Sequence, residues 1–189
     1  ADGRLGPACA RAVKVAPPAR RSLSAVTWAA LARVRGWPLL RHNVCFSRDY
    51  AGEFAALGQG GRLPDEPTVY ICAQDRSDAA GPAGEDPQRV LILINAPPRG
   101  GQGRFTSLEI DACQRATFQV LSRCGLELTL DPSATSRTTP NEFEAMFPST
   151  GGALYGAATQ GWTDSLTRHA ARTKLAGLYL AGGSVHAGA

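Results

Sequence analysis

Lysine, paired cysteine motifs and long apolar runs are all scarce in this 189-residue sequence. No stretch approaches the roughly 20 consecutive apolar residues that a membrane-spanning helix needs, so the sequence predicts a chain that is soluble or at most peripheral to a membrane. The amino-terminal residues also lack the pattern of a signal peptide. Only 2 of the 20 basic residues are lysine. No physical requirement explains that ratio, and we attribute it to genomic base composition.

The cysteines are odd in number, widely spaced and never arranged as CxxC. This spacing argues against a disulfide framework and against a zinc site, and it is typical of a reducing compartment. We expect most of them to be small buried hydrophobic residues. They are Cys9, Cys45, Cys72, Cys113 and Cys124. The sequence also contains no convincing catalytic triad or metal-ligand cluster.

The net charge of +4 is unevenly distributed along the chain. Residues 1–50 carry nine Arg or Lys against Asp2 and Asp49, a balance of +7, so the remaining residues carry −3. A basic end can favour anionic lipid or nucleic acid, although solvated arginines on an ordinary surface give the same count. No aromatic residues are interleaved with these arginines in the manner of a nucleic-acid site, and no nucleic-acid partner is expected.

Apolar periodicity predicts four strands in the first hundred residues. Segment 23–35 has apolar residues at alternate positions, which favours a strand, although its alanines leave a helix possible. A break at 36–38 and a second extended run at 39–46 predict a hairpin. Further strands are expected at 68–73 and 89–96. The last of these is apolar almost throughout, which predicts that both of its faces are covered.

Capping signals predict three helices along the chain. Asp49 can cap a helix that runs to about Leu57. The clearest helix spans 108–124, because Thr106 and Glu109 have the spacing of a capping box and Gly125 follows the last turn. A third start signal lies at 139–142, where Pro140 suits the first helical position. A short helix is also possible at 5–14, and the Gly-rich stretch 149–161 is expected to be irregular.

The carboxy-terminal residues form the most distinctive segment. A short apolar run, 178–181, leads directly into Gly182 and Gly183. Glycines after a strand let backbone N–H groups approach an anion closely, because no side chain intervenes. We expect this strand to belong to a second, parallel, nucleotide-binding sheet whose other strands are absent. The sequence thus predicts an α+β fold, with an antiparallel sheet of about four strands covered by helices, in a fragment that ends within a cofactor site.

Residues 177–189 resemble the carboxy-terminal flavin motif of carotenoid desaturases related to bacterial phytoene desaturase. In that family a Leu-Tyr-Leu-Ala-Gly run followed by Ser/Thr-His-Pro-Gly closes the FAD site. Segments 41–46, 67–75 and 90–98 resemble strands of the same family. Segments 74–76 and 147–156 resemble its methoxyneurosporene or hydroxyneurosporene dehydrogenase branch. The resemblance covers nearly the whole chain from Pro18 and identifies it as similar to the carboxy-terminal part of such an enzyme.

The resemblance implies a domain plan and a reaction. Residues 1–19 would be a connecting segment, 20–174 part of a substrate-binding domain, and 175–189 the start of a truncated FAD-binding segment. The intact protein would desaturate a hydroxylated or methoxylated carotenoid, such as a neurosporene derivative, by hydride transfer to FAD. It would be cytoplasmic and peripherally associated with a membrane, where its substrate dissolves. The chain alone is not expected to retain FAD or to be active.

The same resemblance assigns roles to individual residues. Gly182, Gly183 and Ser184 would contact the FAD, with His186 close by. Three aromatic residues would line a tunnel for the polyene, although aromatic side chains here equally suit plain packing. They are Trp28, Tyr155 and Trp162.

Departures from the family pattern leave other functions open. The amino-terminal GxGxxG fingerprint is absent, and the His-Pro-Gly of the family is His186-Ala187-Gly188 here. A non-catalytic carotenoid- or lipid-binding module is one alternative. A different flavoenzyme, such as an amine oxidase, is another, and an aromatic cage beside the flavin would distinguish it from a desaturase.

Overall fold

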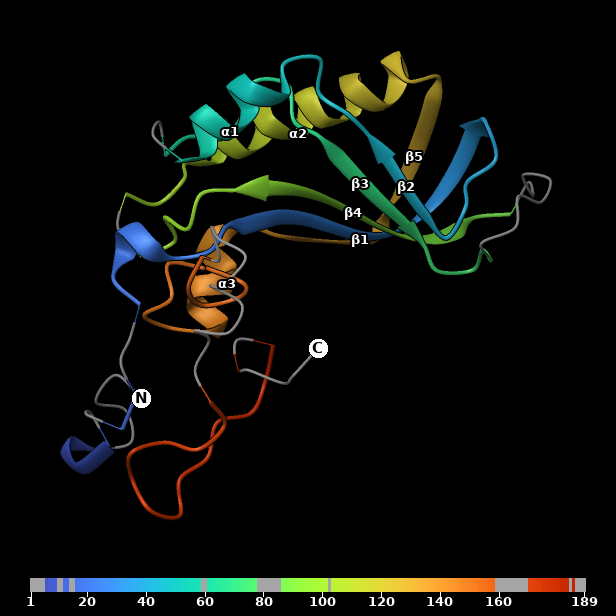
Figure 1. Ribbon diagram of the computed structural model, residues 1–189. Coiled ribbons are helices and arrows are strands. Elements are labelled where there is room, and N and C mark those ends of the chain that lie inside the picture. The colour runs from blue at the N-terminus through green and yellow to red at the C-terminus, as the bar shows by residue number, and fades with distance from the viewer. Residues whose placement is uncertain are drawn as a thin grey trace.

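A computed structural model shows an α+β fold built on one five-stranded antiparallel sheet, as the sequence predicts, with the strand order β2-β3-β4-β1-β5 (Figure 1). The structure describes residues 6–9, 12–13, 16–58, 61–77, 86–101, 103–158, 170–183 and 185. Helices α1 and α2 lie over one face of the sheet. Helix α3 lies on the other side, beside the start of β1 (Figure 1).

The elements of the described residues follow one another without an internal repeat. The strands are β1 (Ser24–Gly36), β2 (His42–Cys45), β3 (Val69–Ala73), β4 (Gln88–Ala96) and β5 (Leu126–Thr138), and the helices are α1 (Tyr50–Gly58), α2 (Ser107–Arg123) and α3 (Pro140–Met146). All three predicted cap-based helices are therefore confirmed to within two residues. In the predicted helix 5–14, the described residues contain only a short 3₁₀ turn, Pro7–Cys9.

The predicted hairpin between the first two strands is wrong. Strand β1 pairs with β4 on one side and β5 on the other, so no edge of β1 is left for β2. Strand β2 pairs with β3 at the far edge of the sheet. Asn43 holds the incoming loop, because its amide donates to the Leu40 carbonyl at 2.7 Å while its carbonyl accepts from the Leu40 N–H at 2.9 Å.

Strand β5, which the sequence prediction missed, completes the sheet. Leucines alternate along its first half, at Leu126, Leu128 and Leu130. Gly36 and Gly125 allow the close crossing that starts this pairing. A Cβ on Gly36 would lie 2.0 Å from the Gly125 carbonyl oxygen, and the φ of Gly36 is +109°. Only glycine fits there without a backbone shift.

The face under α2 is the dry core of the protein. Alternate side chains of β1 and β4 point to this face and are fully buried, among them Val26, Trp28, Ile92 and Ile94. The predicted apolar stripe of α2 packs on them through Ile110, Cys113, Thr117, Val120 and Leu121. Burial raises the pKa of the Cys113 thiol to about 12, so it remains a neutral core residue.

Helix α2 starts where its capping box requires. Thr106 accepts a hydrogen bond from the Glu109 N–H, and the Glu109 carboxylate accepts from the Thr106 N–H at 2.8 Å. Both contacts satisfy N–H groups that the first helical turn leaves free. They hold the pKa of Glu109 below its ordinary value, chiefly through the backbone N–H of Thr106.

The opposite face of the sheet is only partly covered. On β4 the outward positions Leu91, Leu93 and Asn95 are half-buried, whereas every alternate position is buried. Tyr70 and Cys72 on β3 and Leu31 on β1 are half-buried in the same way. We call this side the open face. The prediction that β4 is covered on both faces is therefore wrong for the open face over the described residues.

Residues 178–181 do not form a regular strand with any described part of the chain. They make a single bridge between Tyr179 and Arg172, with the Leu180 N–H donating to the Ala171 carbonyl at 2.7 Å. The expectation that this segment belongs to a second, parallel sheet stays a prediction, as do the predicted domain boundaries.

Candidate functional site

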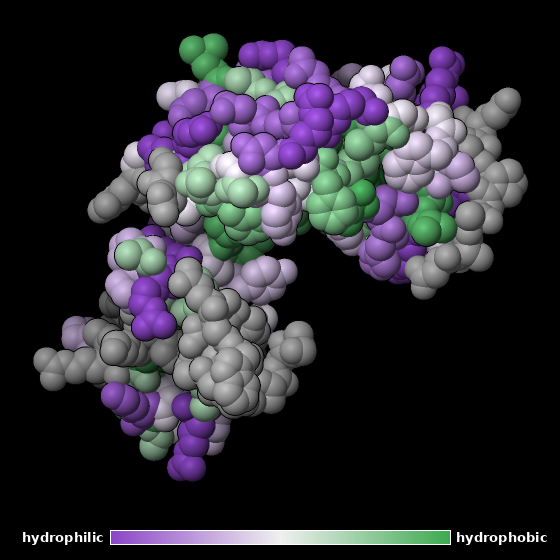
Figure 2. Space-filling view, turned by 45° about the horizontal axis from the view of Figure 1, so that its top comes forward, coloured by the Kyte–Doolittle hydropathy of each residue, from purple (hydrophilic) through white to green (hydrophobic). Residues whose placement is uncertain are grey.

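A cavity of about 720 Å³ opens where the open face meets the segments that precede β1 and follow α3. Ala25 of β1 and Leu93 and Asn95 of β4 supply its floor. Phe54 and Leu57 of α1 close one side. These walls are mainly apolar, and the volume falls in the range typical of small-molecule sites. Figure 2 shows the setting: hydrophilic side chains cover the helical surface, and hydrophobic ones gather below it.

The polar groups at the cavity differ in whether they have hydrogen-bond partners. The Ser22 hydroxyl accepts from the Tyr155 N–H at 2.9 Å and donates to the Leu23 carbonyl. Arg21, the one charged residue among the described lining, donates to the Ser149 carbonyl at 2.9 Å. The buried Ser24 hydroxyl has no hydrogen-bond partner.

The Gly-rich segment after α3 forms the wall opposite the sheet, and Glu144 holds it. Its carboxylate accepts from the N–H groups of Ser149, Thr150 and Gly151 at 2.7, 3.0 and 2.6 Å. Burial would raise the pKa of Glu144, but these backbone donors outweigh it and hold the pKa below its ordinary value. Ser149 has a φ of +69°, the one positive value among described non-glycine residues. The carboxylate thus stabilises a backbone conformation that L residues seldom adopt.

Gly152 lets this segment lie directly on the sheet. Its φ is +82°, and a Cβ there would meet the Pro140 carbonyl oxygen at 2.5 Å and the Ser24 hydroxyl at 3.1 Å. Beyond it, the Leu154 N–H donates to the Leu23 carbonyl at 3.1 Å. These bonds fix Leu154 and Tyr155 against the cavity.

Tyr155 connects the cavity to the predicted cofactor turn. A Cβ on Gly183 would lie 4.0 Å from the Tyr155 ring, so the turn lies close to this ring. Gly182 begins a turn that the Val185 N–H closes on the Gly182 carbonyl at 3.1 Å. A Cβ on Gly182 would meet no atom within 4 Å, and its φ is +131°. The exposed backbone and free space of this turn fit the edge of a bound nucleotide such as FAD.

Other predicted site residues are placed differently. Trp28 does not line the cavity: it is 1% exposed under α2, where its indole N–H donates to Gln114 at 3.1 Å and its ring packs edge-on against Phe118. Its alternation on β1 points it to the covered face, so packing rather than substrate contact explains it. Ser184, His186 and Trp162 lie outside the described residues.

Asn95 and Leu93 are lining residues that the sequence reasoning missed. The signal was present in the sequence, because Asn95 directly follows the apolar run 90–94 near the end of β4. A polar residue at the half-buried end of such a strand indicates that its side chain contacts solvent or a ligand.

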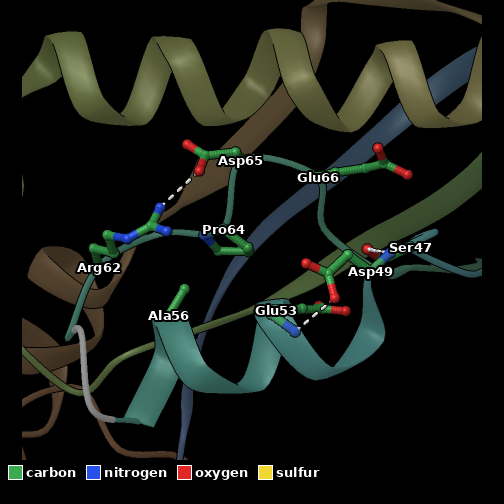
Figure 3. A pocket seen from close by; sticks show the side chains of 9 residues that line it. Ser47, Asp49, Glu53, Ala56, Arg62, Pro64, Asp65 and Glu66 are labelled. Carbon is green, nitrogen blue, oxygen red and sulfur yellow. Dashed lines mark hydrogen bonds and ion pairs between the residues drawn. The ribbon is translucent and has the colours of Figure 1, made fainter.

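A second, smaller crevice of about 130 Å³ lies between α1 and the loop before β3, and acidic residues line it (Figure 3). Arg62 pairs with Asp65 at 2.8 Å. The buried carboxylate of Glu53 accepts from the Thr68 N–H and hydroxyl at 2.9 and 2.6 Å. Within the described residues no group of His, Cys, Asp or Glu could hold a metal ion. These acids tie α1 to β3.

Glu66 completes the same network. It pairs with Arg48 at 3.2 Å and also with Arg123 of α2. The hydrogen bonds from Arg48, followed by that from Arg123, lower the pKa of Glu66 to about 2. Through these two ion pairs, Glu66 links the residues just before α1 to the end of α2 on the surface.

No described helix is both long and apolar enough to cross a membrane.

Comparison with known proteins gives consistent matches. The chain is 48% identical over 188 residues to the hydroxyneurosporene desaturase of Rubrivivax gelatinosus, covering 100% of this chain and 36% of that protein. It is 42% identical to the hydroxyneurosporene desaturase of Rhodobacter capsulatus, with coverage of 100% and 37%. Over 152 residues it is 34% identical to the 1-hydroxycarotenoid 3,4-desaturase of a Flavobacterium species, with coverage of 78% and 30%.

The matches cover this chain but only part of each relative, which limits what can be concluded from them. No protein-family model matches the chain. The chain spans about a third of the length of the curated relatives it matches. Because the matches to the hydroxyneurosporene desaturases run along the whole chain, the chain belongs to the carotenoid desaturase family over the part it shares with these proteins.

Proposed function

We propose that this chain provides the substrate-binding face of an FAD-dependent desaturase that acts on a hydroxylated or methoxylated carotenoid such as a neurosporene derivative. One observation carries the proposal: Tyr155, which lines a large apolar cavity on the open face, lies close to the glycine turn at Gly183. The names of its relatives support the substrate class, since they are desaturases of hydroxyneurosporene and of a 1-hydroxycarotenoid.

The proposed reaction removes two hydrogens from neighbouring carbons, one as a hydride and one as a proton. FAD, when bound, supplies the acceptor for the hydride and its electron pair. The residues that would hold it are Gly182 and Gly183, with Ser184 and His186 following them. The apolar walls of the cavity, with Leu93 and Phe54 among them, would hold the hydrocarbon and keep water from the reacting bond.

The described lining also bears on the alternatives. Phe54 of α1 and Tyr155 of the segment after α3 are the aromatic residues among it, and an aromatic cage beside the flavin would have to be built from such residues. A non-catalytic carotenoid-binding module would have the same apolar cavity. It would lack a use for the glycine turn, and flavin binding by the complete protein separates the two functions.

The direct test is turnover by the complete protein loaded with FAD. Hydroxyneurosporene or methoxyneurosporene is supplied in membranes with an added electron acceptor. We expect a product whose absorption is shifted to longer wavelength, because each new double bond extends the conjugated chain. The flavin-free protein serves as the control. Unchanged carotenoid in the presence of bound, oxidisable flavin would contradict the proposal.

We also propose that the protein is cytoplasmic and associates peripherally with membranes, from which its substrate would come. Phe46, Tyr50 and Phe54 form an exposed aromatic group with ring centroids 6.3 and 4.8 Å apart, and Phe54 reaches the cavity. Exposed aromatic side chains of this kind suit the interfacial zone of a bilayer. Flotation with liposomes should carry the complete protein upward, and a protein that stays in the dense fraction at all lipid compositions contradicts this proposal.

A further inference from the structure

One end of the cavity has a hydrogen-bonding side chain without a partner. Asn95 lies on the open face, is half-buried and lines the cavity. Its carboxamide makes no hydrogen bond with the described residues, although it has two donors and an acceptor. The unpartnered Ser24 hydroxyl is a separate case, because Ser24 alternates with Val26 and Trp28 on β1 and its hydroxyl is enclosed.

Asn95 is the polar residue of the cavity floor. It pairs with Ala25 of β1, so these two side chains point to the same face of the sheet. The rest of the floor, Ala25 and Leu93, is apolar. A ligand that displaces water from this floor leaves the carboxamide without a partner, at a cost of about 1–3 kcal/mol, unless the ligand itself bonds to it.

The charge of the site limits what this ligand can be. Arg21 is the one charged residue among the described lining, and it is already bonded to the Ser149 carbonyl. The Asn95 carboxamide is a neutral group that can donate and accept. It matches a neutral hydroxyl or ether oxygen on an otherwise apolar molecule.

We infer that Asn95 binds the terminal oxygen of the carotenoid and selects hydroxylated over unhydroxylated substrates. This inference rests on the proposed function and adds the residue that discriminates. The oxygen end of the substrate then lies in the cavity whose opposite wall includes Tyr155, next to Gly183. The Flavobacterium relative is named for a hydroxyl at carbon 1 and a new double bond at carbons 3 and 4. In such a substrate, fixing the oxygen places the reacting bond within a few ångströms of it.

The test uses a pair of variants that differ by one hydroxyl. Asn95→Thr retains a hydrogen-bonding group, Asn95→Val removes it, and both β-branched side chains suit a strand. The control is Thr27→Val, which removes a polar side chain on the same face beside Leu93, outside the described cavity lining. Ser24→Ala is the second control, and it leaves the packing of the strand unchanged.

The primary measurement is equilibrium binding of hydroxyneurosporene and of neurosporene to the complete, FAD-loaded protein, read from carotenoid absorbance. We expect the wild type to prefer the hydroxylated carotenoid. Asn95→Val should reduce that preference about tenfold, as loss of one hydrogen bond to a buried partner does, while Asn95→Thr retains most of it. Ser24→Ala, which removes an enclosed hydroxyl on the covered face, and Thr27→Val should both leave it unchanged.

A preference that is equal in the wild type, Asn95→Val and Asn95→Thr proteins would overturn the inference, as would a wild type without any preference. Turnover of the same samples is a separate readout. Desaturation of both carotenoids with an unaltered preference refutes the role of Asn95 alone. Selective binding without desaturation refutes the proposed reaction and leaves the role of Asn95 supported.

Discussion

The covered and open faces of the sheet differ far more in environment than in side-chain chemistry. Along β4, Val90, Ile92 and Ile94 face α2 and are at most 3% exposed. Leu91 and Leu93 point the other way and are half-buried, although they are just as apolar. The covered face is packed against the apolar stripe of α2. The open face offers apolar surface that the described helices cover only in part, and this surface leads into the cavity, where Phe54 and Leu57 of α1 close one side.

This difference separates residues that stabilise the fold from residues available for a ligand. Polar groups on the two faces differ in their access to a ligand. Under α2 the Trp28 indole is bonded to Gln114, and Thr117 donates to the Cys113 carbonyl at 2.8 Å. On the cavity side the half-buried Asn95 carboxamide makes no hydrogen bond with the described residues. Unsatisfied polarity at the edge of an apolar surface is what a substrate with one oxygen and a long hydrocarbon chain requires.

The largest effect should come from truncating one residue on each face. Trp28→Ala removes a buried indole and should cost about 3–5 kcal/mol of unfolding free energy. Leu93→Ala on the open face should cost only about 1 kcal/mol, because half of the side chain is already in contact with solvent. Leu93→Ala should nevertheless weaken carotenoid binding more than any variant of equal stability on the covered face. Denaturant unfolding and carotenoid titration measure the two quantities, and equal stability losses would remove the distinction between the faces.

An intermediate effect is expected at the loop that closes the cavity. Glu144→Ala leaves the N–H groups of Ser149, Thr150 and Gly151 without their acceptor and should cost about 1–3 kcal/mol. Because this loop positions Tyr155, carotenoid affinity should fall together with stability. Glu127→Gln, an exposed change on β5, is the matched control and should alter neither. Unchanged affinity in a destabilised Glu144→Ala protein would show that the loop does not shape the site.

The smallest effect belongs to the surface pairs that join the helices. The pKa of Glu66 is lowered from 4.5 to about 2, so the ionised form favours the folded state. This contribution is fully present above pH 4.5 and is lost as the pH falls toward 2. Glu66→Gln should therefore lower the unfolding temperature slightly at pH 7, and the difference from wild type should disappear by about pH 2. A difference that grows on acidification contradicts this sign. Carotenoid binding should not change at pH 7.

Local signals predicted the helices well and the strand pairing badly. The capping box of Thr106 and Glu109 and the apolar stripe of α2 are set by residues within one or two turns, and both were predicted correctly. The partner of β1 depends on which distant strand reaches its edge. A break at 36–38 is compatible with a hairpin or with a crossing to the far side of the sheet, so the hairpin was the simpler and wrong choice. The alternating leucines of β5 were a local signal that the prediction overlooked.

The candidate site was predictable in part for the same reason. Tyr155 and the glycines at 182 and 183 lie in segments with a family pattern, and the structure places Tyr155 close to Gly183. Trp28 was assigned to the wrong side because an aromatic residue in a strand does not reveal which face it occupies. A polar Asn95 after an apolar run was a local signal that the prediction overlooked, and the cavity with the missing hydrogen-bond partner assigns it to the site.

The most direct measurement of the central claim is a structure of the complete protein with FAD and hydroxyneurosporene bound. The account predicts the hydrocarbon chain along Leu93 and the open face, with the substrate oxygen within hydrogen-bonding distance of the Asn95 carboxamide. A carotenoid bound away from this face, or lying in the cavity with its oxygen far from Asn95, would contradict it.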